Sequence, residues 1–170
     1  MSRTRNFERI SKEQFIKDCR ECGEEFYNVA EAAYDIITKL RRATRRSSGY
    51  DFVSPFSFML EPNENIKFPL GIKAYMLEDE ELLIFPRSSI GFKYRIKIDN
   101  TIGKIDSDFY NNPSNEGDIH ISLTNTGSKY WTVKAGDKIC QGSFYKYLIT
   151  DTDSPEKEDR VGGIGSTNER

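Results

Sequence analysis

Residues 118–123 read Asp-Ile-His-Ile-Ser-Leu, and this stretch indicates the fold class. Its apolar side chains alternate with polar ones, a period of two that is typical of a strand with one buried face. Residues 92–98, Phe-Lys-Tyr-Arg-Ile-Lys-Ile, alternate in the same way. We therefore expect a strand in each stretch, with Ile119, Ile121 and Leu123 on the opposite face from His120.

Clusters of Gly, Pro, Asn and Asp interrupt the chain at short intervals around these stretches. They lie at residues 61–65, 111–117, 125–127 and 135–137. Such residues favour tight turns, and short strands between frequent turns suit a sandwich or a barrel. The sequence predicts a mostly β domain over residues 34–150.

A different period marks the N-terminal segment. Ser11 and Gln14 form the S-x-x-Q pattern of a helix capping box, and Ile10 and Phe15 flank it as a hydrophobic staple would. Apolar residues then recur at intervals of three and four, as on one face of a helix. These residues are Phe15, Cys19, Cys22, Phe26, Ala30 and Ala33. We expect a helical extension over residues 1–33, its helix running from Ser11 to about Ala33 and weakened at Gly23.

Length and charge narrow the function classes. The chain has 170 residues, which fits one domain, and its net charge of −2 is too balanced for a dedicated polyanion binder. Basic residues at 39–46 raise a nucleic-acid alternative, but the run is short and lacks interleaved aromatic rings, so a solvated loop is the simpler account. The longest apolar runs, such as residues 82–85, fall far short of the roughly 20 residues of a membrane helix. We expect neither nucleic acid nor membrane as a partner.

One histidine and three cysteines limit the metal and redox chemistry. With His120 alone, HExxH zinc sites and histidine-cluster metal centres are excluded. The N-terminus is charged and lacks the apolar segment that drives secretion, so we expect a cytoplasmic protein without a disulfide framework. Cys19-x-x-Cys22 has no second CxxC to complete a zinc site, and the buried face of the helix is the simpler account.

The C-terminal segment, residues 151–170, contains only Val161 and Ile164 as aliphatic side chains. This offers too little burial to offset the entropy of ordering the segment, so we expect a mobile arm. Its glycine-rich end, residues 162–167, could wrap backbone N–H groups around the phosphate oxygens of a ligand.

Five short motifs follow one another along the chain. They are Ser48-Gly49-Tyr50-Asp51, Pro86-Arg87-Ser88-Ser89, Gly103-Lys104-Ile105-Asp106-Ser107-Asp108-Phe109, Ala135-Gly136-Asp137-Lys138-Ile139-Cys140-Gln141 and Arg160-Val161-Gly162-Gly163-Ile164-Gly165-Ser166-Thr167. Together and in this order they resemble the motifs of the trimeric dUTP pyrophosphatases (dUTPases). The likeness covers roughly residues 39–167, and the N-terminal helix and an insert at 110–117 resemble the longer bacterial or phage-type branch.

This resemblance implies a jelly-roll-like β-barrel subunit, a homotrimer, and Mg²⁺-dependent hydrolysis of dUTP to dUMP and pyrophosphate. Such hydrolysis needs a water that is deprotonated and aimed at the α-phosphorus. Asp106 matches the family's water-activating aspartate. Phe109 stands where the family usually has a tyrosine whose ring packs on the deoxyribose, and a ring there leaves no room for a 2′-hydroxyl.

The resemblance also implies how the base is recognised. Asn100 and the strand around Ile119 and His120 match the hairpin that reads uracil, largely through main-chain groups that would leave cytosine unpaired. Gly103, which opens the third motif, is expected to belong to the same binding site. His120 itself is expected to be a surface strand residue with a positional role only.

Phosphate binding is implied by the second, fourth and fifth motifs. Arg87 and Ser88 match the triphosphate-binding Arg-Ser-Gly, with Ser89 in place of the glycine, and Gln141 matches a phosphate-contacting glutamine. Asp51 matches an aspartate near the metal, which it would reach through water because Mg²⁺ binds mainly substrate oxygens. The arm residues implied to clamp the nucleotide are Arg160, Ile164, Gly165, Ser166 and Thr167, with Ile164 in place of the phenylalanine that usually stacks on uracil.

Two alternatives stay open at this point. The dCTP deaminases share the fold and a Pro-Arg-Ser-type motif, although the glycine-rich arm favours a dUTPase. A dUTP-binding regulatory protein would use the same pocket to control a protein partner, and the N-terminal helix is the feature that could contact this partner.

Overall fold

The computed structural model describes residues 3–155, and its secondary structure is mostly β, as the turn spacing predicts. The helices are α1 (Lys12–Cys22), α2 (Glu24–Tyr27), α3 (Ala30–Ile36) and α4 (Ser88–Tyr94), with a 3₁₀ turn at Ser107–Phe109. The strands are β1 (Asn6–Arg9), β2 (Arg41–Arg42), β3 (Tyr50–Val53), β4 (Phe58–Leu60), β5 (Asn65–Pro69), β6 (Ile72–Tyr75), β7 (Glu80–Pro86), β8 (Ile96–Ile98), β9 (Gly103–Asp106), β10 (His120–Asn125), β11 (Trp131–Val133) and β12 (Lys138–Lys146). None of the helices within residues 3–155 has the length and apolar character needed to cross a membrane.

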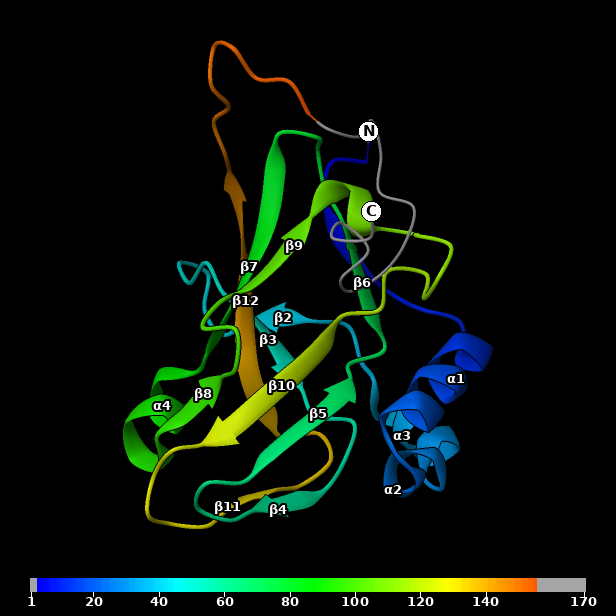
Figure 1. The fold of residues 1–170 in the computed structure, drawn as a ribbon, viewed down its shortest axis with the longest axis vertical. Helices are drawn as coiled ribbons and strands as arrows, with labels where there is room; N and C mark the ends of the chain where they lie inside the picture. The colour runs from blue at the N-terminus through cyan, green and yellow to red at the C-terminus, as the bar shows by residue number, and fades with distance from the viewer. Residues whose placement is uncertain (1–2, 156–170) are drawn as a thin grey trace.

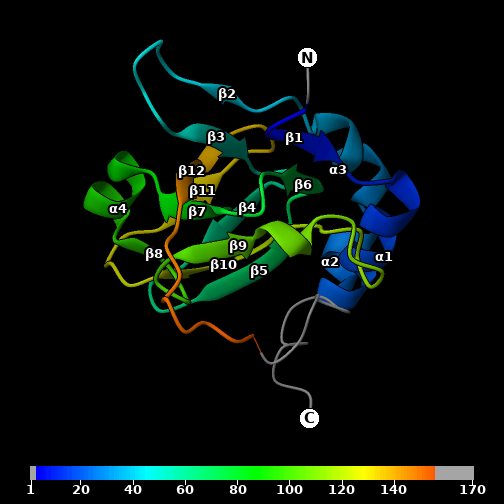
Figure 2. The same cartoon turned by 90° about the horizontal axis from the view of Figure 1, so that it is seen from above.

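Within the described residues the strands form four small antiparallel sheets (Figure 1). The largest has the order β2-β3-β12-β7-β9, and a second has the order β5-β10-β8, while β1 pairs with β6 and β11 with β4. The hairpin strands β8 and β9 belong to different sheets, because β8 pairs with β10 and β9 with β7. The chain therefore passes from one sheet to the other at residues 99–102. Figure 2 shows α4 and the α1–α3 group on opposite sides of the strands.

The N-terminal helix is interrupted, so the prediction of one helix over Ser11–Ala33 is wrong in its extent. α1 ends at Gly23, whose φ of 152° lies in a region that favours glycine. A short α2 and then α3 follow, and α3 runs past Ala33 to Ile36. Glycine at the predicted weak point thus ends the helix, and the segments fold back on one another.

The predicted apolar face survives this break. Five of its six members are buried: Phe15, Cys19, Phe26, Ala30 and Ala33, while Cys22 is half-buried. Cys19, Cys22 and Cys140 are all free thiols. Burial raises the pKa of the Cys19 thiol to about 12, which makes this thiol a poor redox nucleophile and agrees with a core role.

The strand expected over residues 92–98 is only partly present. Residues 88–94 form α4, and only Ile96–Ile98 is a strand. Ile90 and Tyr94, four residues apart, pack toward the core, whereas Phe92 is 82% exposed. The same apolar residues fit a helical turn, and the αL conformation of Arg95 (φ 60°) then ends the helix before β8.

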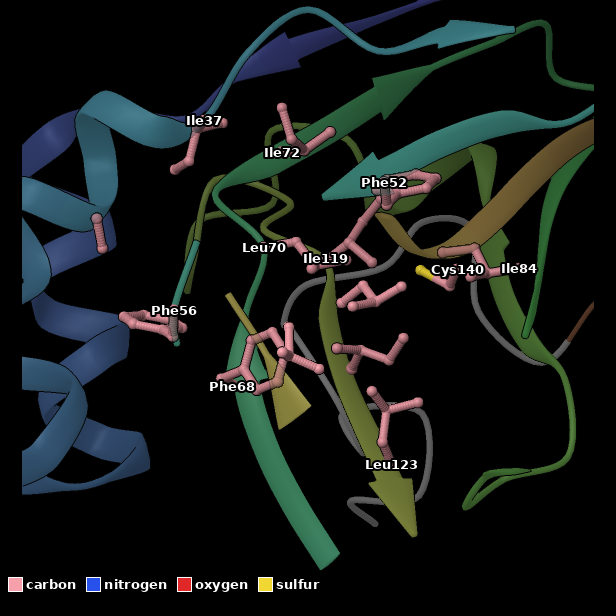
Figure 3. Close-up of a cluster of buried hydrophobic side chains, with 14 of the residues drawn as sticks. Ile37, Phe52, Phe56, Phe68, Leu70, Ile72, Ile84, Ile119, Leu123 and Cys140 are labelled. Atoms are coloured by element: carbon pink, nitrogen blue, oxygen red, sulfur yellow. The ribbon is translucent and has the colours of Figure 1, made fainter. Parts of the chain in front are cut away.

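The core is one continuous cluster that joins the sheets to the helices (Figure 3). Leu123 and Ile119 of the β10 segment lie within it, as the alternation of residues 118–123 predicts. Phe15 from α1 and Phe68 from β5 are both fully buried and each lies near Phe56, at ring-centroid distances of 6.1 and 5.5 Å. The helical segment therefore packs on the β domain rather than forming a separate core.

The insert at residues 110–117 is hydrogen-bonded to the start of α1. Ser11 accepts a hydrogen bond from the Gln14 N–H (3.2 Å), so the cap is present. In a capping box the Gln14 side chain would accept a hydrogen bond from the Ser11 N–H. Glu116 takes this place here, because the Ser11 N–H donates to Glu116 Oε2 (2.9 Å) and the Ser11 hydroxyl donates to Glu116 Oε1 (2.6 Å). These bonds lower the pKa of the Glu116 carboxyl. The insert thus caps a helix about 100 residues away.

Candidate active site

A cavity of about 500 Å³ opens between the two larger sheets, beside the β8–β9 turn. Its walls come from β5, β7, β8, β9 and β10. The cavity gathers the residues that the sequence assigns to catalysis and to base or sugar binding. These are Asn100, Gly103, Asp106, Phe109, Ile119 and His120.

Asp106 is the last residue of β9, where it lies at the rim of this cavity. Its side chain is 44% exposed, and its Oδ1 lies 3.9 Å from the Lys104 ammonium. Lys104 also forms an ion pair with Glu81 on β7 at 2.9 Å, and this hydrogen bond raises the pKa of Lys104. The carboxylate is therefore reachable by water and lies near a cation that stays charged.

Phe109 reaches the cavity from the 3₁₀ turn that follows Asp106. The ring is 6% exposed, and the Phe109 C=O accepts a hydrogen bond from the Asn112 side-chain amide at 2.9 Å. Gly103 lies against Ile84, where an added Cβ would come within 3.1 Å of the Ile84 Cβ. The Phe109 residue and the Asp106 carboxylate therefore line the same cavity.

Main-chain groups of the β10 segment also face the cavity. The Ile119 N–H donates to the Ile72 C=O (3.0 Å), and the Ile119 C=O accepts from the Leu70 N–H (2.9 Å). Backbone groups of successive strand residues point to opposite edges. The N–H and C=O of His120 therefore point to the β8 edge, where β8 pairs only with residues 123–125. A planar base in the cavity could form hydrogen bonds with the His120 N–H and C=O at this edge.

A second polar group lies on the five-stranded sheet and contains the predicted phosphate residues. Asp51 on β3 is 7% exposed, and its two oxygens bind the Arg87 Nε (3.2 Å) and the Lys138 Nζ (2.7 Å). Gln141 on β12 is paired with Asp51 in the strand register, and Gly49 leaves room for its side chain, because a Cβ on Gly49 would lie 2.6 Å from Gln141 Oε1. The group combines two cations and an amide, which suits phosphate oxygens.

Ser88 and Ser89 begin α4 directly after Arg87. Ser89 replaces the glycine of the family motif, yet it lies in the first turn of a helix and has no positive φ. Serine therefore adopts this backbone without strain.

The predicted base and sugar residues and the predicted phosphate residues do not line one cavity. Among the described residues, Arg87 and Gln141 are absent from the walls of the 500 Å³ cavity, and Asp51 and Arg87 border two other depressions that both include Lys138. The arm residues Arg160, Ile164, Gly165, Ser166 and Thr167 lie outside the described residues. One chain therefore presents the base side and the phosphate side as two separate surfaces.

His120 is not the surface residue that the alternation predicts. Its side chain is only 10% exposed, and Nε2 lies 3.8 Å from both Asp18 Oδ2 and Asp118 Oδ2. The face of β10 that should meet solvent is instead approached by α1. Nothing in the sequence singles out Asp18 or Asp118, because the two are 100 residues apart and no short motif joins them.

Comparison with known proteins now adds to this geometry. A family model described as dUTPase matches residues 35–168. The deoxyuridine 5′-triphosphate nucleotidohydrolase of Lactococcus lactis subsp. lactis (strain IL1403) is 36% identical over 143 residues, which are 79% of this chain and 95% of that protein. The Finegoldia magna (strain ATCC 29328) protein of the same name is 33% identical over 131 residues, which are 74% of this chain and 87% of that protein.

Solved structures give the same result for the fold. The dUTPase from Streptococcus mutans superposes with a TM-score of 0.65 at 29% identity, covering 86% of this chain and 98% of that one. The dUTPase of Staphylococcus bacteriophage 80alpha gives 0.63 at 16% identity, covering 93% and 99%. The predicted jelly-roll-like fold is thereby confirmed. On the family model, the sequence relatives and the fold together, this chain belongs to the dUTPase family and is a dUTP diphosphatase.

Proposed function

We propose that the chain hydrolyses dUTP to dUMP and pyrophosphate, with Asp106 as the base that activates the attacking water. Asp106 accepts a proton from the water as the oxygen attacks the α-phosphorus, and the bond from this phosphorus to the bridging oxygen breaks to release pyrophosphate. The observation that carries the proposal is the convergence of Asp106, Phe109 and His120 on one cavity. The carboxylate matches the α-phosphate, the aromatic ring matches the deoxyribose, and the main-chain groups match the base.

Base selection follows from the main chain at the β10 edge. Uracil presents an acceptor, a donor and an acceptor along one edge, and cytosine has a different order. A backbone N–H and C=O at fixed positions can pair with the uracil edge. With cytosine, polar groups are left unpaired, which weakens the binding of cytosine relative to uracil. Phe109 excludes the 2′-hydroxyl of ribonucleotides by contact.

Phosphate binding requires more than one subunit in this proposal. Arg87 and Gln141 lie away from the cavity of their own chain, so we assign them to the cavity of a neighbour in a homotrimer. Arg87 supplies a planar fork for phosphate oxygens, and Asp51 orients this fork through the Nε contact at 3.2 Å. The arm, with Ser166 and Thr167, would close over the same site.

Mg²⁺ is assigned to the nucleotide rather than to a protein cage. Both oxygens of Asp51 already bind cationic side chains, so Asp51 is a poor direct ligand in this state. Mg²⁺ commonly keeps several waters and binds substrate phosphates. When bound there, it neutralises charge on the triphosphate, and a contact from Asp51 would run through water.

The experiment that tests this function is pyrophosphate release from dUTP in Mg²⁺, with dCTP, dTTP and UTP in parallel. Of the four nucleotides, we expect only dUTP to be hydrolysed at a high rate. Ammonia released from dCTP would instead indicate a deaminase, and tight dUTP binding without pyrophosphate release would indicate a regulatory protein. We place the activity in the cytoplasm, in agreement with the free thiols of Cys19, Cys22 and Cys140.

A further inference from the structure

Three side chains from distant parts of the chain meet beside the cavity without satisfying one another. Asp18 comes from α1, Asp118 from the turn before β10, and His120 from β10 itself. The side chains of Asp18, Asp118 and His120 are 2%, 0% and 10% exposed. Asp18 Oδ2, Asp118 Oδ2 and His120 Nε2 are buried, and none has a hydrogen-bond partner within residues 3–155.

The other oxygen of each carboxylate is held from outside the group. Asp18 Oδ1 accepts a hydrogen bond from the Gln14 side-chain amide at 2.7 Å, and Asp118 Oδ1 accepts one from the Ile72 N–H at 3.2 Å. Each carboxylate is therefore fixed in orientation, with one oxygen paired and the other directed at the group. Ligands of a bound metal show this arrangement, because outer partners orient the inner donors.

Charge is unbalanced at this place. Among the described residues, no lysine or arginine forms an ion pair with Asp18 or Asp118. A buried carboxylate without a counter-charge is strongly destabilising. A single imidazole, even when protonated, supplies one positive charge against two carboxylates, whereas a dication would balance both.

The donor set and its spacing suit a small transition-metal ion. The three donor atoms lie within 4.8 Å of one another, and the two nitrogen–oxygen separations are 3.8 Å. Neighbouring ligand atoms around tetrahedral zinc are about 3.4 Å apart, since its bonds to nitrogen and oxygen are about 2.0–2.2 Å. Shifts of a few tenths of an ångström would therefore bring the two nitrogen–oxygen pairs to this spacing. Mg²⁺ fits less well, because it prefers oxygen ligands and gives up its waters reluctantly.

We propose that Asp18, Asp118 and His120 form a structural zinc site that joins α1 to the base-binding strand β10. The imidazole Nε2 and one oxygen from each carboxylate are the three protein ligands, and water completes the tetrahedron. This site is separate from the Mg²⁺ of the nucleotide, because none of its three ligands borders the depressions at Asp51 and Arg87. The ion would hold the first α-helix against the strand whose main chain faces the base.

The test measures zinc binding to the full-length protein in the absence of nucleotide. The purified protein is stripped with chelator, titrated with Zn²⁺, and then assayed for bound zinc by elemental analysis and for its melting temperature. We expect one equivalent per chain and a higher melting temperature with zinc than with chelator. Asp18→Asn should weaken zinc binding by more than about tenfold, as loss of a ligand does at least as much as loss of an outer partner.

Two further variants keep the test decisive. Asp35→Asn changes an exposed carboxylate on α3 and should bind zinc like the wild type. Gln14→Ala removes only the amide that orients Asp18 and should weaken zinc binding about tenfold, which serves if Asp18→Asn does not fold. Equal zinc affinity in the wild type and in whichever of the Asp18→Asn and Gln14→Ala variants folds would overturn the proposal.

The identity of the metal and of the ligands is checked in the same preparation. Mg²⁺ in place of Zn²⁺ should leave the melting temperature of the stripped protein unchanged. Co²⁺ in place of Zn²⁺ should give the visible spectrum of a tetrahedral site without a thiolate charge-transfer band. A thiolate band would assign the metal to Cys19 or Cys22 and overturn the ligand set. A wild-type protein that binds no zinc would overturn the proposal.

Discussion

Asp106 owes its proposed role to its place at the end of a strand. β9 ends at this residue, and the chain then turns through Ser107–Phe109, so a carboxylate and an aromatic ring three residues apart reach one cavity. The side chain is 44% exposed, which leaves it open to a water and a substrate. A polar turn that only closed a hairpin would not need this convergence.

Asp106→Asn should lower kcat for dUTP by about 10² to 10⁴, while dUTP still binds, because the amide keeps the shape and loses the basic lone pair. Pyrophosphate release and calorimetric binding of dUTP measure the two effects. Asp108→Asn, which changes an exposed aspartate two residues away, is the matched control and should keep its turnover. Turnover at the wild-type rate in folded Asp106→Asn protein would rule out Asp106 as the base.

Arg87 depends on its fork geometry as well as on its charge. Its Nε lies 3.2 Å from an Asp51 carboxylate oxygen. Arg87→Lys keeps the charge and loses both the fork and the Nε contact, so we expect a rise in KM for dUTP of about tenfold. Steady-state kinetics check this, with Arg45→Lys in the exposed loop before β3 as the control. An unchanged KM would remove Arg87 from phosphate binding.

At the scale of elements, the insert at 110–117 acts as a clamp on the N-terminal segment. Glu116 accepts two hydrogen bonds from Ser11, and the Tyr110 hydroxyl donates to Glu8 Oε2 at 2.5 Å. Glu116 itself has a positive φ of 58°, and Gly117 follows at 87°, so the turn is shaped to bring this carboxylate to the cap. The insert and α1 are therefore one structural unit, although they are far apart in the sequence.

The Glu116 contact should make stability depend on pH in the acid range. Its folded pKa is lowered, chiefly by the Ser11 hydroxyl, so its contribution is present above the unfolded pKa of about 4.3 and is lost as pH falls through the folded pKa. Glu116→Gln should therefore lower the melting temperature at pH 7 and reduce its fall between pH 5 and 3. Glu13→Gln, an exposed change in the first turn of α1, is the control for thermal unfolding. Equal acid sensitivity of Glu116→Gln and wild type would contradict this account.

At the scale of the whole molecule, large apolar side chains on the described surface suggest contact with further subunits. Leu148 is 97% exposed, Phe92 82% and Ile149 70%. Exposed apolar residues of this kind often mark protein interfaces. The separation of the cavity from the phosphate residues agrees with this, since both would be completed by assembly.

Subunit complementation tests whether the sites are shared. Asp106→Asn with its arm intact and a chain ending after Asp159 with Asp106 intact should each be inactive as homotrimers. In a mixed trimer, one subunit can supply Asp106 and another the intact C-terminal arm to the same site. Co-refolding the two variants should therefore restore part of the activity, while mixing them without subunit exchange should not. Wild-type protein taken through the same refolding is the control. Verified mixed trimers without activity would show that each site is built within one chain.

The sequence by itself determined the mostly β class and the first turn of α1. These depend on local physics, because alternation, capping and turn chemistry act over a few residues. The residues around the cavity were indicated instead by the resemblance of the motifs to those of the dUTPases. The same reasoning failed at residues 92–94 and at Gly23. At residues 92–94, the spacing of Ile90 and Tyr94 fits a helical period as well as an alternating one. At Gly23, the conformation of the backbone decides where α1 ends.

Only the tertiary structure decided what surrounds His120 and how the motifs are grouped. Asp18 and Asp118 approach this histidine because α1 packs on β5, the strand paired with β10, which brings segments about 100 residues apart together. The structure also separated Arg87 and Gln141 from the cavity that contains Asp106. Such outcomes depend on non-local packing of strands and helices, which no short motif encodes, whereas the chemistry of each motif is already present in its own residues.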